Sequence, residues 1–237
     1  MPLAGDAMTK KAEPPKTSRI LLVDDHPVVR DGLAEAIRSE PGLDVCGVAD
    51  DRHEALHAAE TSNPDLVIID LLLKSSSGLE LIKDMHARWP RLLILVVSMQ
   101  EEQVYAERVL RAGARGYITK QRATRDILAA IHRVLAGGIY LNSEIASTVL
   151  QRLTSNPEAT SDSLTDSLTD RELQVFELTG IGLSTRELAE RLHLDVKTVE
   201  TYRARIKEKL KLKDGNEMLK LAIRWNRDRS LGSELPK

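Results

Sequence analysis

Three aspartates, a serine and a lysine follow short apolar runs and could together handle a phosphoryl group. Asp24 and Asp25 end "RILLVDD", Asp70 ends "LVIID", Ser98 closes "LLILVVS" and Lys120 follows "GYIT". Adjacent carboxylates repel each other, and a hard divalent cation such as Mg²⁺ would offset that repulsion through oxygen ligands. A hydroxyl and an ammonium facing the same point suit a phosphoryl group. Asp70 is the natural nucleophile because a carboxylate can form an acyl phosphate.

Whether these residues meet depends on the elements that carry them. Short runs rich in Val, Ile and Leu alternate with segments of helical length. The predicted strands are 20–23, 43–49, 66–69, 92–98 and 116–119, and the predicted helices are 27–39, 52–62, 79–89, 103–112 and 124–136. Uninterrupted apolar runs are typical of parallel strands buried on both faces. Five such units predict a doubly wound α/β domain, an α/β fold class.

The carboxyl ends of parallel strands share one edge of the sheet, where such folds bind ligands. A single polar residue after a strand is more often just the start of a loop. Here four strands end in polar side chains of types that suit one chemistry. Their joint occurrence favours a site over four unrelated loop starts.

Length, charge, cysteine content and apolar runs limit the kinds of protein to which this chain can belong. The 237 residues suffice for one large or two small domains, and the formal charge of -2 does not indicate a partner. Cys46 is the only cysteine, which excludes a disulfide framework within one chain and fits a reducing cytosol. No apolar run approaches the ~20 residues of a membrane span. Residues 1–17 lack the apolar core of a signal peptide and have the composition of a disordered tail. We expect a soluble, cytoplasmic protein.

The alternation stops after residue 141. Residues 143–153 have a helical pattern, and the stretch "TSNPEATSDSLTDSLTD" that follows has linker composition. Of its two "SLTD" copies only the second starts a helix, because Thr169 has Glu172 three residues later and forms a capping box. We expect a tail at 1–17, an α/β domain at 18–141, a linker at 142–163, a helical domain at 164–228 and a tail at 229–237.

The helical domain has the spacing of a helix-turn-helix. Its predicted helices are 170–180, 185–192, 196–211 and 216–225, with a second capping box at Ser184 and Glu187 and Asp195 as a further cap. The link "HLD" is short, and the helix after it carries a basic row at Arg203, Lys207 and Lys211. Charge alone leaves a solvated basic face as an equal alternative. As the second helix of a helix-turn-helix, this segment would lie in a DNA major groove.

The five polar residues, with Gly78 eight residues past Asp70 and the ending "GYITK", resemble a two-component receiver domain over residues 18–137. The resemblance implies a flavodoxin-like, doubly wound sheet of five parallel strands and identifies Asp70 as the phosphoacceptor. It implies Mg²⁺ as the cofactor, held by Asp24, Asp25, Asp70 and the backbone carbonyl of Leu72. Ser98 and Lys120 would hold the phosphoryl oxygens, and Ser98 and Tyr117 would act as the switch. One departure is Lys74, where the family usually has proline.

The stretch from "LTDRELQVF" to "TVETYRARIKEKL" resembles LuxR-type helix-turn-helix domains over residues 164–225. The resemblance implies a small all-α domain of four helices. The implied DNA contacts are Lys197, Thr198, Glu200, Thr201, Arg203, Ala204, Arg205 and Lys207. Many members carry basic residues where Glu200 and Ala204 stand, so base readout would rest more on Thr201 and Arg205. Candidates for dimerisation are Leu219, Ala222 and Ile223, which could equally be core residues.

Together the two halves resemble a response regulator of the NarL/FixJ class. That implies a phosphorylation-activated transcriptional regulator of a two-component system, with a sensor histidine kinase or phosphotransfer protein and double-stranded DNA as partners. It would bind DNA as a homodimer when phosphorylated and would catalyse only its own phosphotransfer. An alternative is a receiver-controlled signalling protein that acts through protein partners without DNA. A phosphate-ester hydrolase would want a second acid at position 72, where the chain has leucine.

Overall fold

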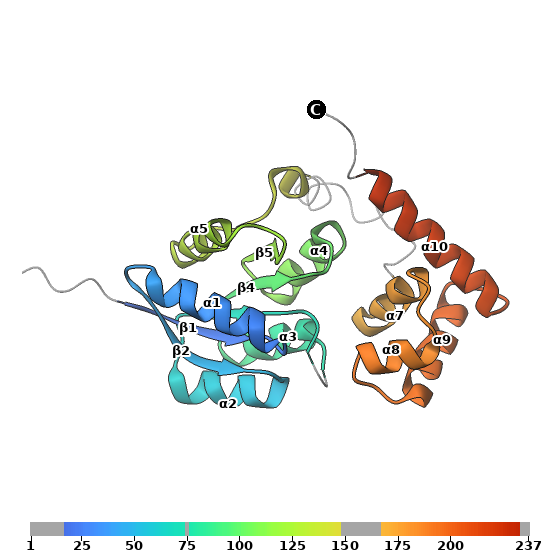
Figure 1. Ribbon diagram of the computed structural model, residues 1–237, viewed down its shortest axis with the longest axis horizontal. Helices are drawn as coiled ribbons and strands as arrows, with labels where there is room; N and C mark the ends of the chain where they lie inside the picture. Colours follow the sequence, from blue (N-terminus) through green and yellow to red (C-terminus); the bar gives the residue numbers. More distant parts are fainter. Residues whose placement is uncertain (1–16, 74–75, 148–166, 233–237) are drawn as a thin grey trace, which may run out of the picture.

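The structure, a computed structural model, describes residues 17–73, 76–147 and 167–232. Its first part is a parallel sheet of five strands in the order β2-β1-β3-β4-β5 (Figure 1). The strands are β1 (Ser18–Val23), β2 (Leu43–Ala49), β3 (Leu66–Ile69), β4 (Leu93–Ser98) and β5 (Gly116–Thr119). The predicted α/β class and parallel sheet are therefore confirmed.

Helices cover both faces of this sheet. They are α1 (Pro27–Ser39), α2 (Arg52–Ser62), α3 (Gly78–Arg88), α4 (Glu102–Ala112) and α5 (Thr124–Leu135). Alternate residues of β1 divide between two clusters of buried side chains: Leu21 and Val23 pack with α2, α3 and α4, whereas Ile20 and Leu22 pack with α1 and α5. Burial on both faces explains why the strands carry uninterrupted apolar runs.

The outer strands of the sheet have irregular or covered edges. Between β1 and β2 the register passes from Ile20 opposite Val45 to Leu21 opposite Gly47, so Cys46 is an extra residue in β2. On the other side, Tyr140 forms an isolated bridge with Gly116 of β5, and the Tyr117 amide donates to the Tyr140 carbonyl at 2.9 Å.

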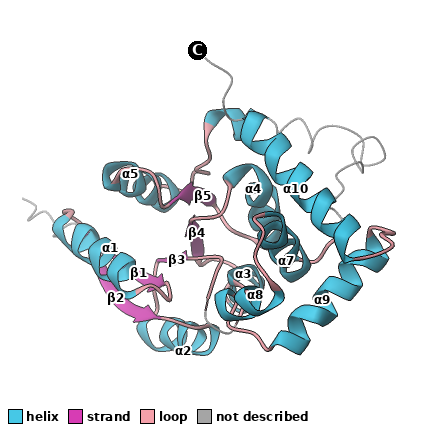
Figure 2. Ribbon diagram, turned by 45° about the vertical axis from the view of Figure 1, so that its right-hand side comes forward, coloured by secondary structure: helices cyan, strands magenta, loops and turns pink. Residues whose placement is uncertain are grey.

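The second part of the molecule is helical. Its described helices are α7 (Asp170–Gly180), α8 (Thr185–Arg191), α9 (Val196–Lys209) and α10 (Gly215–Gly232). Both predicted capping boxes are present. The predicted cap at Asp195 is wrong in part: the residue precedes α9, but its side chain makes no capping hydrogen bond. α7 lies beside α4 of the first part (Figure 2).

Some predicted elements differ from the observed ones or fall on undescribed residues. α10 continues to Gly232, beyond the predicted end at residue 225. Of the helix predicted at 143–153, residues 143–147 are helical and the rest lies outside the described residues. Lys74, the first "SLTD" copy and most of both predicted tails also lie outside them. No helix in the described ranges has the length and apolar character needed to cross a membrane.

Candidate functional site

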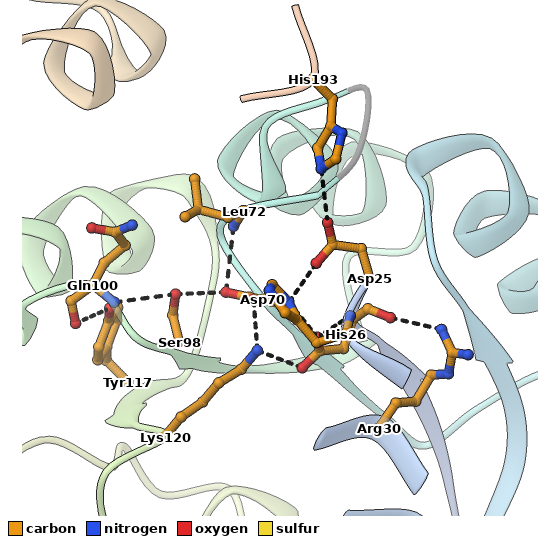
Figure 3. A network of polar contacts seen from close by, with 11 residues as sticks. Asp25, His26, Arg30, Asp70, Leu72, Ser98, Gln100, Tyr117, Lys120 and His193 are labelled. Carbon is orange, nitrogen blue, oxygen red and sulfur yellow. Dashed lines mark hydrogen bonds and ion pairs between the residues drawn. The ribbon is translucent and has the colours of Figure 1, made fainter. Parts of the chain in front are cut away.

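The carboxyl ends of the strands bring Asp70, Ser98 and Lys120 into direct contact (Figure 3), and Asp24 contacts the same lysine. Asp70 is 3% exposed. Its Oδ1 accepts a hydrogen bond from Ser98 Oγ, and its Oδ2 accepts one from Lys120 Nζ, each at 2.6 Å. Lys120 Nζ also lies 2.6 Å from Asp24 Oδ2. The lysine thus bridges the ends of β1 and β3, where two buried carboxylates would otherwise repel each other.

Burial, neighbouring charges and hydrogen bonds shift the pKa values of Asp70 and Lys120. Burial raises the pKa of Asp70 and outweighs the lowering by the Lys120 charge and by the hydrogen bonds from Lys120 and Ser98. Burial alone would lower the pKa of Lys120, but the nearby carboxylates of Asp70 and Asp24 raise it overall. The lysine therefore stays charged at neutral pH and holds the carboxylates in place.

Asp25 and His26 complete a cluster of potential metal ligands in which carboxylate oxygens predominate. The Asp25 side chain is 7% exposed, and its Oδ1 accepts no hydrogen bond, although His26 Nδ1 lies 2.7 Å away. Ligand atoms of Asp24, Asp25, His26 and Asp70 lie within 4.8 Å of one another. Carboxylate oxygens in this number suit a hard divalent cation. The sequence prediction did not include His26, although its place directly after Asp25 and its capacity to bind metals were a usable signal.

The other residues assigned to the receiver pocket lie around Asp70. The Leu72 amide donates to Asp70 Oδ1 at 3.3 Å. Tyr117 is fully buried, and its hydroxyl donates to the Gln100 carbonyl at 2.9 Å. Tyr117 therefore occupies an inward position in this structure, while Ser98 already contacts Asp70.

Gly78 sets the position of α3 against the loop that follows Asp70. Its amide donates to the Leu71 carbonyl at 3.0 Å. A β-carbon added at Gly78 would overlap the backbone carbonyl oxygen of Asp70 and lie 2.7 Å from Leu71 Cα. Only glycine permits this close approach of the helix to the loop.

α9 presents most of its candidate DNA contacts to solvent. Val199 and Ile206 are buried against the other helices of the domain. The exposed candidates are Lys197, Glu200, Thr201, Ala204 and Arg205, and the half-buried ones are Thr198, Arg203 and Lys207. Arg203 donates to Thr185 Oγ1 at 3.1 Å and so also joins α9 to α8.

The three dimerisation candidates on α10 differ in exposure. Ala222 is fully buried and belongs to the domain core. Its backbone packs so closely on α7 that a β-carbon at Gly180 would lie 2.5 Å from the Ala222 carbonyl oxygen. Leu219 is half-buried, and Ile223 is 47% exposed. Only Ile223 offers a large apolar surface to a partner.

Comparison with known proteins agrees with the division of the chain into an α/β domain and a helical domain. Residues 20–132 match the response regulator receiver domain, and residues 166–222 match the bacterial regulatory proteins of the luxR family. Response regulator GacA of Pseudomonas aeruginosa is 34% identical over 206 residues, which cover 87% of this chain and 95% of GacA. The chain belongs to the NarL/FixJ class of response regulators. Oxygen regulatory protein NreC of Staphylococcus carnosus is 30% identical to this regulator over 210 residues, 87% of this chain and 97% of NreC.

Solved structures of response regulators show the same fold. The crystal structure of a LuxR-family two-component response regulator from Aurantimonas has a TM-score of 0.55 and 33% identity, and covers 59% of this chain and 100% of its own. RcsB from Salmonella enterica serovar Typhimurium, bound to promoter rprA with the phosphomimetic BeF3-, has a TM-score of 0.57. At 22% identity, over 86% of this chain and 98% of RcsB, that likeness bears on the fold alone.

Proposed function

We propose that this response regulator accepts a phosphoryl group on Asp70 from a sensor histidine kinase or a phosphotransfer protein, and that phosphorylation controls its binding to promoter DNA. The observation that supports Asp70 most directly is its buried carboxylate, with Ser98 Oγ and Lys120 Nζ each at 2.6 Å. An ammonium and a hydroxyl at this distance stabilise the charge that develops on transferring phosphoryl oxygens.

In the proposed transfer, a carboxylate oxygen of Asp70 attacks the phosphorus of a phosphohistidine. The P–N bond to the histidine breaks as the P–O bond to Asp70 forms, so the product is an acyl phosphate. Lys120 and Ser98 would turn from the carboxylate toward the new phosphoryl oxygens. Beyond this self-catalysed step we propose no enzymatic activity.

We further propose Mg²⁺ as the cofactor of the transfer. Asp24, Asp25 and Asp70 would hold the ion, together with the backbone carbonyl of Leu72. The donor set fits, because it is dominated by carboxylate oxygens and Asp25 Oδ1 accepts no hydrogen bond. When bound, the ion would neutralise charge on the acceptor and the phosphoryl group.

For DNA we propose that α9 lies in the major groove and that the phosphorylated protein binds as a homodimer. The exposed basic side chains of Lys197 and Arg205 would contact DNA, together with the half-buried Arg203 and Lys207 on the same helix. Two half-sites would then lie about one helical turn apart. Because it would act on promoters, we place the protein in the cytoplasm. Exposed Glu200 on α9 favours a second candidate, a regulator that acts through protein partners.

Substitution of the acceptor tests the proposal directly. Asp70→Asn keeps the shape of the side chain but removes the nucleophilic oxygen, so we expect labelling by acetyl phosphate or by a kinase to be lost. Intact-protein mass spectrometry would follow the added phosphoryl group. Asp44→Asn, an exposed position on β2, is the matched control and should label like the unchanged protein. Persistent labelling of Asp70→Asn would show that another residue is the acceptor.

A further inference from the structure

A cavity of about 700 Å³ lies at the amino-terminal edge of the sheet, opposite the edge that carries Asp70. Ser18, Asp65 and Leu93 line it, and they stand at or just before the starts of β1, β3 and β4, which are neighbours in the sheet. β1 begins on the side of the sheet that faces away from the helical domain (Figure 1). The cavity is therefore separate from the pocket around Asp70, and its volume suits a small molecule.

Apolar side chains from both faces of the sheet form the walls of this cavity. Trp89 and Leu92 also pack against the buried cluster on the α2 and α3 face. Leu93 and Leu135 pack against the cluster on the α1 and α5 face. Trp89 directly follows α3 and is half-buried, so part of this side chain remains accessible to a ligand. An indole can stack on another flat aromatic ring.

Two arginines at the same cavity have no acidic partner in the described part of the chain. Arg88 ends α3 and Arg91 lies in the loop before β4, so they flank Trp89 in the sequence, and both are exposed. Neither makes an ion pair or a hydrogen bond with a described residue. A guanidinium presents its N–H groups in a planar fork that matches a carboxylate or a phosphate. The two side chains can therefore bind an anion from solution.

Arginines near the end of a helix often bind its last carbonyl groups instead. Arg19 does this for α2, because its Nε and Nη2 donate to the Ser62 carbonyl at 3.1 and 2.8 Å. Arg88 and Arg91 make no such bond within the described ranges. Helix capping therefore does not account for their place at the cavity.

The remaining charged group of the cavity gives it a direction. Asp65 stands just before β3, and its Oδ2 accepts a hydrogen bond from the Arg19 amide at 2.9 Å. Like charges repel, so an anionic group would lie away from Asp65 and toward Arg88 and Arg91. A ring attached to that group would then lie over Trp89, which stands between the two arginines in the chain.

We propose that this cavity binds a flat aromatic ring that carries one anionic group, as in a nucleoside monophosphate. The ring stacks on Trp89, and Arg88 and Arg91 bind the anionic group. A phosphate and a carboxylate share this chemistry, and the experiment below separates them. The site goes beyond the proposed function, because it uses none of the residues around Asp70 and needs no phosphorylation.

The tryptophan signals of the full chain report on this site. The chain has two tryptophans, so a proton–nitrogen NMR spectrum shows two indole signals, and Trp225→Phe leaves only that of Trp89. Adenosine monophosphate should shift the Trp89 signal saturably, with half-saturation below about 1 mM. Adenosine and inorganic phosphate each offer half of the recognised chemistry and should bind at least roughly tenfold more weakly. No saturable shift with adenosine monophosphate and none with naphthoate, or equal binding of adenosine, would overturn the proposal.

Naphthoate, a flat ring with a carboxylate, separates the two kinds of anion. Tighter binding of adenosine monophosphate than of naphthoate would assign the site to phosphate esters. The reverse order would assign it to aromatic carboxylates. Either order supports a site for an anionic ring.

Arginine variants test which groups bind the anion. The double variant Arg88→Ala, Arg91→Ala should weaken the tighter of the two ligands roughly tenfold or more, because it loses both charged donors. Arg125→Ala is the matched control, since this arginine is 88% exposed in the first turn of α5. The amide signals of the same spectra show that each variant is folded. Equal affinity in the double variant and the control would overturn the assignment of the arginines.

A variant at the other edge of the sheet tests whether the two sites are separate. Asp70→Asn should bind the same ligand within about twofold of the unchanged protein, because the cavity lies at the opposite ends of the strands. Loss of binding in Asp70→Asn would place the ligand in the pocket around Asp70 and overturn the proposal. Failure of Asp70 labelling would remove the proposed function and leave this site unaffected.

Discussion

At the scale of single residues, Lys120 offsets the repulsion between the carboxylates at the ends of two neighbouring strands. Its ammonium lies 2.6 Å from both Asp24 and Asp70, so two buried carboxylates share one positive charge. A phosphoryl group on Asp70 would carry about -1.5 to -2 charge units and would replace the single negative charge of the carboxylate. The lysine can follow that charge because its long side chain pivots about a fixed backbone position.

Gly78 supports a prediction about stability at the same scale. Gly78→Ala should lower the free energy of unfolding by about 3 kcal/mol, because the new methyl would overlap the backbone after Asp70. The control is Gly32→Ala, which has open space in α1 and should raise stability by about 0.5 to 1 kcal/mol. Urea unfolding measures both. Equal stability of the two variants would contradict the close approach at Gly78.

Single residues also mark what the sequence could predict. Asp24, Asp70, Ser98 and Lys120 were expected together because parallel strands end at one edge of a sheet. The contact between Tyr105 and Glu177 was not expected, although both residues were visible in the sequence. The two residues are 72 positions apart and meet only because the domains dock. Neither hydrophobic period nor local charge encodes which faces of two domains meet.

At the scale of elements, Glu172 ties the start of α7 to α9. Its carboxylate accepts from the Thr169 amide at 2.8 Å and from Lys209 Nζ at 2.6 Å. Burial alone would raise the pKa of Glu172, but the hydrogen bonds from Lys209 and Thr169 lower it overall. A lowered pKa means that the stabilisation is present above the unfolded value of about 4.3 and is lost as pH falls through the folded value.

Replacing this residue should therefore change the acid limb of stability. In Glu172→Gln the free energy of unfolding of the protein should be lower at neutral pH and should fall less steeply below about pH 4.5. Urea unfolding across a pH series measures the slope, and exposed Glu190→Gln on α8 serves as the control. An acid slope in Glu172→Gln as steep as in the control would show that this carboxylate is not the group that titrates.

Elements were predicted well where apolar periodicity was strong. Strands β2, β3 and β5 and helices α1, α2 and α7 have the predicted ends. α10 runs on to Gly232 because "NRDRS" contains no helix breaker, although its polar residues gave no apolar stripe to follow. The prediction that Asp195 caps α9 was wrong in part, because the residue type favours a cap but does not fix the orientation of the side chain.

At the scale of the whole molecule, a chain with a formal charge of -2 must concentrate its positive charge to bind DNA. α9 does this with the basic side chains described above. Replacing Arg203, Arg205 and Lys207 by alanine should flatten the salt dependence of DNA binding. Each lost phosphate contact lowers the slope of log affinity against log salt by roughly 0.9. The slope should therefore fall by up to about 3.

Fluorescence titration of a labelled duplex at several salt concentrations measures this slope. Arg125→Ala removes a charge whose side chain is 88% exposed on the receiver and should leave the slope unchanged. Thermal unfolding should accompany the triple variant, because Arg203 also bonds Thr185. A folded triple variant with the original slope would move the DNA interface away from α9 and favour action through protein partners.

The extra residue at Cys46 has a consequence for how the protein behaves in concentrated solution. β2 is the outermost strand on its side, and an insertion breaks the regular spacing of amides and carbonyls that a foreign strand would need. At the opposite border the Tyr140 bridge already occupies part of β5. Both edge strands of the sheet therefore disfavour edge-to-edge pairing with strands of neighbouring molecules.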